Sequence, residues 1–141
     1  MRRIRKMLKN GKKGEGYIET VIFVFVATAL IVFSVNVFQL FSLRSDLDQY
    51  AKQVLETASV TGSLGSETMQ RIDELSEQSG LHPDISFEGT VFWTEGSDRI
   101  QYGEPIRVTV SVRSELSGFG LLSLPVTLKA SAGGLSRRYW K

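Results

Sequence analysis

The feature that most constrains this chain is an uncharged apolar run over residues 21–41, which reads VIFVFVATALIVFSVNVFQLF. About 20 apolar residues in a helix, at roughly 1.5 Å each, match a hydrocarbon core of about 30 Å. A cleavable secretory signal has a shorter apolar part of about 7 to 15 residues and then small residues, whereas this run ends in Gln39, Leu40 and Phe41. The run therefore predicts a helix that spans a membrane and stays attached to the rest of the chain.

Basic residues are concentrated ahead of this run. Seven of the 17 Lys and Arg residues lie in positions 1–13, and such residues hold a short flank on the cytoplasmic side. The pattern predicts a cytoplasmic N-terminus and an exported C-terminal part. After Ser42 the chain has ten basic and 13 acidic residues, so the net charge of +2 and the pI near 9.0 come from the tail. The exported part therefore has no charge reason to bind nucleic acid.

The helix is expected to continue beyond the membrane. After Ser42, apolar residues at spacings of three and four predict one stripe on a helix. These residues are Leu43, Leu47, Ala51, Val54, Leu55 and Ala58. Charges of alternating sign recur four apart on the opposite face, at Arg44, Asp48, Lys52 and Glu56. No Gly or Pro interrupts residues 17–60, so we expect one helix on the order of 66 Å long, half in lipid and half on a globular domain.

Residues 12–20, KKGEGYIET, lie directly before the apolar run. They resemble the class III signal of type IV pilin-like proteins, which a membrane-embedded peptidase cuts after a Gly that follows basic residues. The resemblance implies a cut after Gly14, so that Glu15 becomes the first mature residue and Glu19 the fifth, where the family has a Glu. An acidic first residue departs from the small or apolar one common in pilins. A cut after Gly16 is the alternative, and it would make Glu19 the third residue.

The carboxylate of Glu19 would stand near the end of the spanning segment. A charge there costs up to a few kcal/mol unless it is hydrated or paired. The pilin resemblance implies that the partner is the new α-amino group of a neighbouring subunit, and that this pair sets the stagger between helices. The alternative is that Glu19 stays hydrated at the interface, in the acidic first turn that helices favour.

The remaining residues predict a small α+β domain. Residues 61–65 are expected to form a loop, with Ser66 as the N-cap of a short helix that ends at Gly80. Met69, Ile72 and Leu75 are predicted to form its apolar side. Strands are expected at 85–93 with a bulge at Gly89, at 99–102, at 106–113, and at 124–130 after a loop at 118–120. A turn is expected at 95–98, and Pro125 suggests an edge strand.

This reading divides the chain into four parts: a basic cytoplasmic leader at 1–14, a transmembrane helix at 15–43, its amphipathic continuation at 44–60, and an exported head at 61–141. The expected head is a short helix with three or four antiparallel strands, against which the long helix packs. This is the α+β layout of a small pilin head.

The whole chain resembles the TadE-like minor pseudopilins of tight-adherence pilus loci. It is most similar to an uncharacterised family of small single-pass membrane proteins of Gram-positive bacteria, often associated with pilus or conjugative loci. The segments that carry the resemblance are 13–19 (KGEGYIE), 102–110 (YGEPIRVTV), 118–120 (GFG), 124–128 (LPVTL) and 136–141 (SRRYWK). The resemblance implies no enzymatic activity.

No constellation of catalytic or metal-binding residues is visible in the sequence. The chain has no Cys and one histidine, His82, in an expected loop. The adjacent acidic pairs are expected on solvated helix faces; they are Asp46 with Asp48 and Asp73 with Glu74. Residues 124–127, LPVT, match part of a cell-wall sorting motif, but position 128 is Leu where that motif requires Gly, so a strand is predicted. We expect no enzyme, cofactor or metal.

The leading hypothesis is a minor pilin-like structural subunit of a tight-adherence or type IV-like pilus, or of a related secretion system. Its expected partners are membrane lipid, other pilin-like subunits, assembly proteins and a prepilin peptidase that cuts between Gly14 and Glu15. The expected location is the cell membrane, with the C-terminal domain extracellular. The alternative is an unprocessed single-pass accessory or adhesive component of a conjugation or secretion machine.

Overall fold

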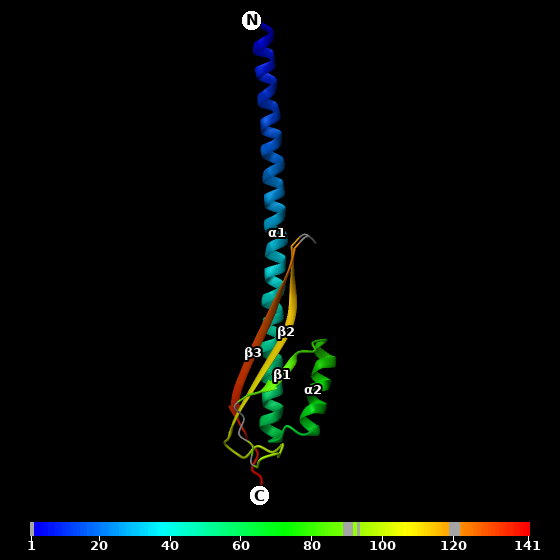
Figure 1. Cartoon of the computed structure of the whole chain (residues 1–141), viewed down its shortest axis with the longest axis vertical. Helices are drawn as coiled ribbons and strands as arrows, with labels where there is room; N and C mark the ends of the chain where they lie inside the picture. The colour runs from blue at the N-terminus through cyan, green and yellow to red at the C-terminus, as the bar shows by residue number, and fades with distance from the viewer. Residues whose placement is uncertain (1, 89–91, 93, 119–121) are drawn as a thin grey trace.

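A computed structural model describes the backbone of residues 2–88, 92, 94–118 and 122–141, and within these ranges the side chains from residue 16 onward except 117, 118 and 122. Its elements, in chain order, are α1 (Arg2–Thr61), α2 (Ser66–Ser79), β1 (Asp84–Phe87), β2 (Pro105–Gly118) and β3 (Leu122–Leu135). Figure 1 shows α1 as a rod, with the other elements gathered around its C-terminal half. The predicted α+β class is confirmed.

The long helix is continuous, as predicted. Helix α1 is 60 residues long, and its C-terminal half supplies much of the core through its apolar stripe. Leu47, Ala51, Val54 and Ala58 are buried, and Leu55 packs against the core at its edge. Of the four charges predicted on the opposite face, Asp48 and Lys52 form an exposed ion pair with 4.0 Å between Oδ2 and Nζ.

Strands β1, β2 and β3 form one antiparallel sheet in that order. Ile106, Val108 and Val110 alternate along β2 and are buried against α1, which confirms the predicted period of two. Pro125 pairs with Glu115 in β3, the outer strand, where the missing N–H of proline costs the sheet nothing. Strands β2 and β3 each have 14 residues, so the hairpin is much longer than the predicted strands at 106–113 and 124–130.

The short helix α2 begins one residue differently from the prediction. Gly65 is the N-cap residue and Ser66 the first helical residue, with no side-chain cap; Thr68 instead donates from Oγ1 to the carbonyl oxygen of Ser63, at 2.7 Å. The buried face consists of Thr68, Ile72 and Leu75. Met69 was expected on that face, but it is 45% exposed because its position lies one residue off the 68–72–75 spacing. Gly80 ends the helix in the left-handed region at φ 67°, as predicted.

The segment between β1 and β2 is mostly irregular. The predicted strand at 85–93 is a strand only to Phe87, and Gly89, Val91 and Trp93 lie outside the described residues. The predicted turn at 95–98 is present, with the Ser97 amide donating to the carbonyl oxygen of Thr94 at 3.0 Å. The predicted strand at 99–102 is wrong: Arg99 makes one isolated bridge, to Ser63. Of the predicted loop at 118–120, Gly118 belongs to β2 and the other two residues are outside the described part.

Candidate membrane and assembly segment

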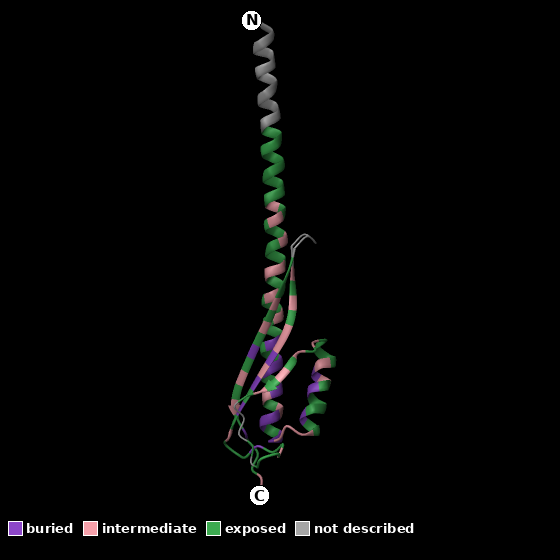
Figure 2. Ribbon diagram, viewed as in Figure 1, coloured by how far each residue is buried: buried purple, intermediate pink, exposed green. Residues whose placement is uncertain are grey.

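The segment of α1 from residue 16 to residue 41 is apolar and mostly exposed. A segment within Gly16–Thr61 reaches a mean hydropathy of 2.7 over 18 residues, and none of that stretch is buried. Phe23 and Phe38 are each 74% exposed. Figure 2 shows this part of the helix as a mostly exposed rod above the buried core. By length and composition the helix can cross a membrane, and its exposure distinguishes it from the core helix of a soluble domain.

The polar side chains inside this apolar segment are largely satisfied by their own helix. Thr28 and Ser34 donate from their hydroxyls to the carbonyl oxygens of Val24 and Leu30, each at 2.8 Å. Asn36 donates from Nδ2 to the carbonyl oxygen of Val32 at 2.8 Å. Such bonds to the residue four positions earlier spare a hydroxyl or amide donor from facing lipid unpaired. These three residues are therefore compatible with a hydrocarbon environment.

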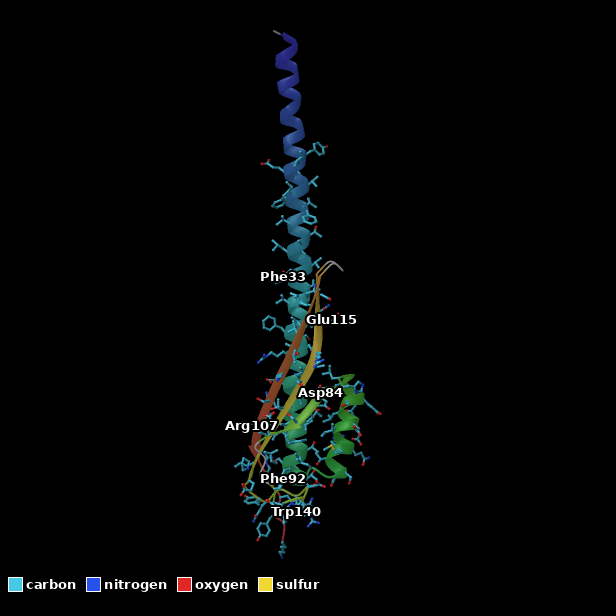
Figure 3. All side chains as sticks on the ribbon, viewed as in Figure 1. Phe33, Asp84, Phe92, Arg107, Glu115 and Trp140 are labelled. Atoms are coloured by element: carbon cyan, nitrogen blue, oxygen red, sulfur yellow. The ribbon has the colours of Figure 1, made fainter. Side chains whose placement is uncertain are left out.

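One face of the apolar segment is partly covered. Most of the half-buried positions follow helical spacing and lead into the core stripe at Leu47. These are Ala29, Val32, Asn36, Leu40 and Leu43, and the other half-buried positions are Ala27 and Val37. Figure 3 shows the hairpin of β2 and β3 running alongside α1 past Glu115, until its far end reaches the level of Phe33. Phe38 and Phe41 remain 74% and 69% exposed in the same part of the helix, so the hairpin covers only one side.

The predicted processing and assembly residues all lie on this rod. Gly14 and Glu15 fall within α1, in the part whose side chains are not described, and no geometry for cleavage follows from them. Glu19 is exposed, and no side chain in the described ranges forms an ion pair with it. A Cβ added at Gly16 would meet nothing within 4 Å. The helix therefore presents Glu19 outward, two residues before the apolar run.

The histidine and acidic residues that could have formed a catalytic or metal site are distributed over α1, α2 and the loop after α2. His82 is exposed in the loop after α2, and Asp46 and Asp48 lie on the solvated face of α1. Glu74 accepts a hydrogen bond from Arg71 at 2.6 Å, one turn earlier on α2. Among the described residues, no group of three or more His, Asp or Glu side chains could hold a metal ion. The LPVT segment lies in β3, so its predicted strand is confirmed.

A cluster at the pole opposite the N-terminus was not found from the sequence. The indole ring of Trp140 contacts two guanidinium groups, with Cζ of Arg99 at 4.7 Å and Cζ of Arg138 at 4.6 Å from the ring centroid. Its Nε1–H donates to the carbonyl oxygen of Gly62 at 3.0 Å. The contact spans 78 residues of sequence, and it fastens the C-terminal segment to the end of α1. Nothing local in the sequence indicates a contact so distant along the chain.

These features define a class of protein: a single helical rod with an apolar, mostly exposed segment at residues 16–41, and a small α+β head formed around its C-terminal half. The profile of a family described as a domain of unknown function (DUF4320) matches residues 24–141, and the chain belongs to this family. No curated protein and no solved structure matches the chain. The matched region begins inside the apolar segment, so the signal-like residues 12–20 lie outside it.

Proposed function

We propose that this protein is a minor pilin-like structural subunit, inserted in the cell membrane by the N-terminal half of α1 and assembled through that half with similar helices. The observation that carries the proposal is the continuity of α1. The same helix that is apolar and exposed from Gly16 onward becomes the central core element from Leu47 onward, with no linker between. Continuity fixes the head rigidly to the membrane segment.

Rigid attachment is what distinguishes a packing subunit from a tethered head. A head on a flexible linker samples many orientations, so contacts between membrane helices would not position it. Here the axial stagger between two neighbouring α1 helices would also set the stagger between their heads. A carboxylate at Glu19, exposed and close to the apolar run, is a suitable group to define that stagger by pairing with the α-amino group of a neighbour.

The proposed topology follows from the charges. The basic leader at 1–14 remains in the cytoplasm, the apolar part of α1 crosses the bilayer, and the head faces the exterior. A prepilin peptidase on the cytoplasmic side would then cut after Gly14 and expose the α-amino group of Glu15.

The N-terminal mass of the membrane-extracted protein tests the processing step. In cells with a prepilin peptidase, the chain is expected to begin at Glu15, and Gly14→Val is expected to leave it uncut at Met1. The matched variant Gly16→Val adds the same side chain two residues later, where there is open space, and is expected to be cut normally. Unprocessed wild-type protein in such cells would contradict processing, and loss of cutting in Gly16→Val alone would move the cut to Gly16.

The second candidate is an unprocessed accessory component of a secretion or conjugation machine. The family match covers residues 24–141, so the signal-like residues 12–20 lie outside it and the match lends the processing step no support. A photo-crosslinker in place of the exposed Phe23 separates the two candidates. Crosslinks to other single-helix pilin-like subunits support the pilin-like subunit, and crosslinks to a multi-span channel protein support the accessory component.

A further inference from the structure

The β2–β3 hairpin extends far beyond the core. Gly134 packs against the side chain of Leu55 and pairs with Ile106, which fixes the hairpin to α1 near its C-terminal end. From Ile106 to Gly118, β2 covers about 40 Å at roughly 3.3 Å per residue. From Leu55 back to Phe33, α1 covers about 33 Å at about 1.5 Å per residue. The two lengths agree once the strand is tilted, and Figure 3 shows the same overlap between the hairpin and Phe33.

This overlap conflicts with a membrane span at 21–41. If the outer hydrocarbon boundary lay at Phe41, the last five or six residues of β2 would be in hydrocarbon beside Phe33 to Phe41. Strand β1 pairs with β2 only from Val108 to Ser111, so β2 has no strand on that side beyond Ser111 within the described part of the chain. Its free N–H and C=O groups, and those on the outer edge of β3, would then lack partners in lipid.

The charged side chains of the hairpin also argue against placing it in hydrocarbon. Arg113 and Glu115 are exposed on the far half of β2, on the face turned away from α1. Immersing a row of unpaired backbone groups and these charges is costlier than leaving Phe38 and Phe41 in the interfacial layer, where aromatic rings are tolerated. The hairpin must therefore remain in the hydrated head-group layer, and the helix must sit deeper in the bilayer than its hydropathy alone suggests.

We propose that the β2–β3 hairpin rests in the head-group layer of the outer leaflet and sets the depth of α1 in the membrane. The outer hydrocarbon boundary then lies near residue 34. About 20 helical residues span the hydrocarbon, which puts the inner boundary near Glu15. Glu19 then lies roughly 6 Å inside the hydrocarbon from its inner boundary, whereas a span at 21–41 would leave it about 3 Å outside, in the hydrated head-group layer. This inference rests on the proposed membrane insertion. A carboxylate at that depth requires a pairing partner, and the proposed assembly role of Glu19 is to bind such a partner.

The chain has no cysteine, so single Cys variants of the full-length protein report depth directly. In proteoliposomes, a membrane-impermeant maleimide is supplied on both sides. Ser123→Cys probes an exposed position near the hairpin end, and Ile18→Cys probes the turn beside Glu19 without removing its carboxylate. Leu30→Cys is the buried-in-lipid control, and Lys141→Cys is the exposed control. Labelling in detergent gives the full signal for each variant.

The inference predicts full labelling of Ser123→Cys and loss of labelling at Ile18→Cys until detergent is added. The reverse pattern, with Ser123→Cys protected and Ile18→Cys labelled, would overturn it in favour of a span at 21–41. Any other combination with Leu30→Cys protected also overturns it while leaving membrane insertion intact. Labelling of Leu30→Cys without detergent would instead show that α1 does not span, and the proposed function would fail with it.

Discussion

The two halves of α1 share one backbone and have opposite surroundings. Between Gly16 and Val26 every side chain is exposed, and from Ala27 to Val35 most still are, whereas between Leu47 and Thr61 apolar side chains are buried along one stripe. This difference in burial follows from the spacing of apolar residues in the sequence. An apolar residue at nearly every position makes a helix without a polar face, and a spacing of three and four makes a helix that packs on one side.

The comparison shows where the stability of the head comes from. The C-terminal half contributes to folding through burial against β2, β3 and α2. The part of α1 from Gly16 to Val26 buries no side chain within the described part of the chain, so under the proposed function its contacts are with lipid and neighbouring helices.

The largest difference is expected from the same truncation in each half. Leu47→Ala removes a fully buried side chain and is expected to lower the free energy of unfolding of the head by about 2–5 kcal/mol. Leu30→Ala, on the exposed half, is expected to change it by less than about 0.5 kcal/mol. Denaturant titration of full-length protein in mild detergent, followed by tryptophan fluorescence, measures both. Equal losses of unfolding free energy in the two variants would show that both halves of α1 contribute equally to the stability of the head.

A charge in the N-terminal half should affect insertion and spare the fold. Leu30→Arg is expected to weaken membrane insertion, by less than the about 2.5–3.5 kcal/mol of an arginine at the helix centre, because residue 30 lies only about four residues inside the proposed outer boundary. The measurement is the fraction that resists carbonate extraction from membranes, with Leu30→Ala as the matched control. Undiminished membrane retention of Leu30→Arg would argue against a lipid environment for this half.

Two glycines, one after α1 and one after α2, have similar backbone conformations and different surroundings. Gly62 and Gly80 have φ of 66° and 67°, but a Cβ at Gly62 would lie 2.6 Å from the Cβ of Arg138, while a Cβ at Gly80 meets open space. Gly80→Ala is expected to cost about 1 kcal/mol from backbone strain, and Gly62→Ala roughly 2–3 kcal/mol because the C-terminal segment must also move. Thermal unfolding of both variants tests whether that segment is truly fastened to the helix end.

The smallest effect is expected from the surface ion pair on the C-terminal half. Asp48 and Lys52 are 4.0 Å apart and largely exposed, so Asp48→Asn should change stability by less than about 0.5 kcal/mol. Denaturant midpoints of wild type and variant measure this. A loss above about 1 kcal/mol would mean that this face is covered in the assembled state.

The helices and central strands were predictable because their signals are local. The stripe from Leu47 to Ala58 and the alternation along Ile106, Val108 and Val110 each repeat within a few residues. The left-handed end of α2 at Gly80 follows from a single glycine in the right place.

What escaped prediction depends on contacts distant in sequence. Tyr50 is buried because its hydroxyl is 2.8 Å from Oγ of Ser76, and Trp140 is held by Gly62. The length of the hairpin escaped because residues 114–118 keep the strand alternation only weakly, so sequence alone ended the strand at Arg113. Hydropathy alone could not predict how deep α1 sits in the membrane. That depth is limited by the β2–β3 hairpin, which is about 80 residues away along the chain.

The central claim is that α1 crosses the membrane with its apolar segment in lipid and its C-terminal half in the aqueous head, so that the leader is inside the cell and the head outside. Impermeant maleimide labelling of spheroplasts tests it directly, in cells that lack a prepilin peptidase so that the leader is retained. Lys141→Cys is predicted to label in intact spheroplasts, and Asn10→Cys only after the membrane is permeabilised. Protection of Lys141→Cys together with labelling of Asn10→Cys in intact spheroplasts would contradict the account.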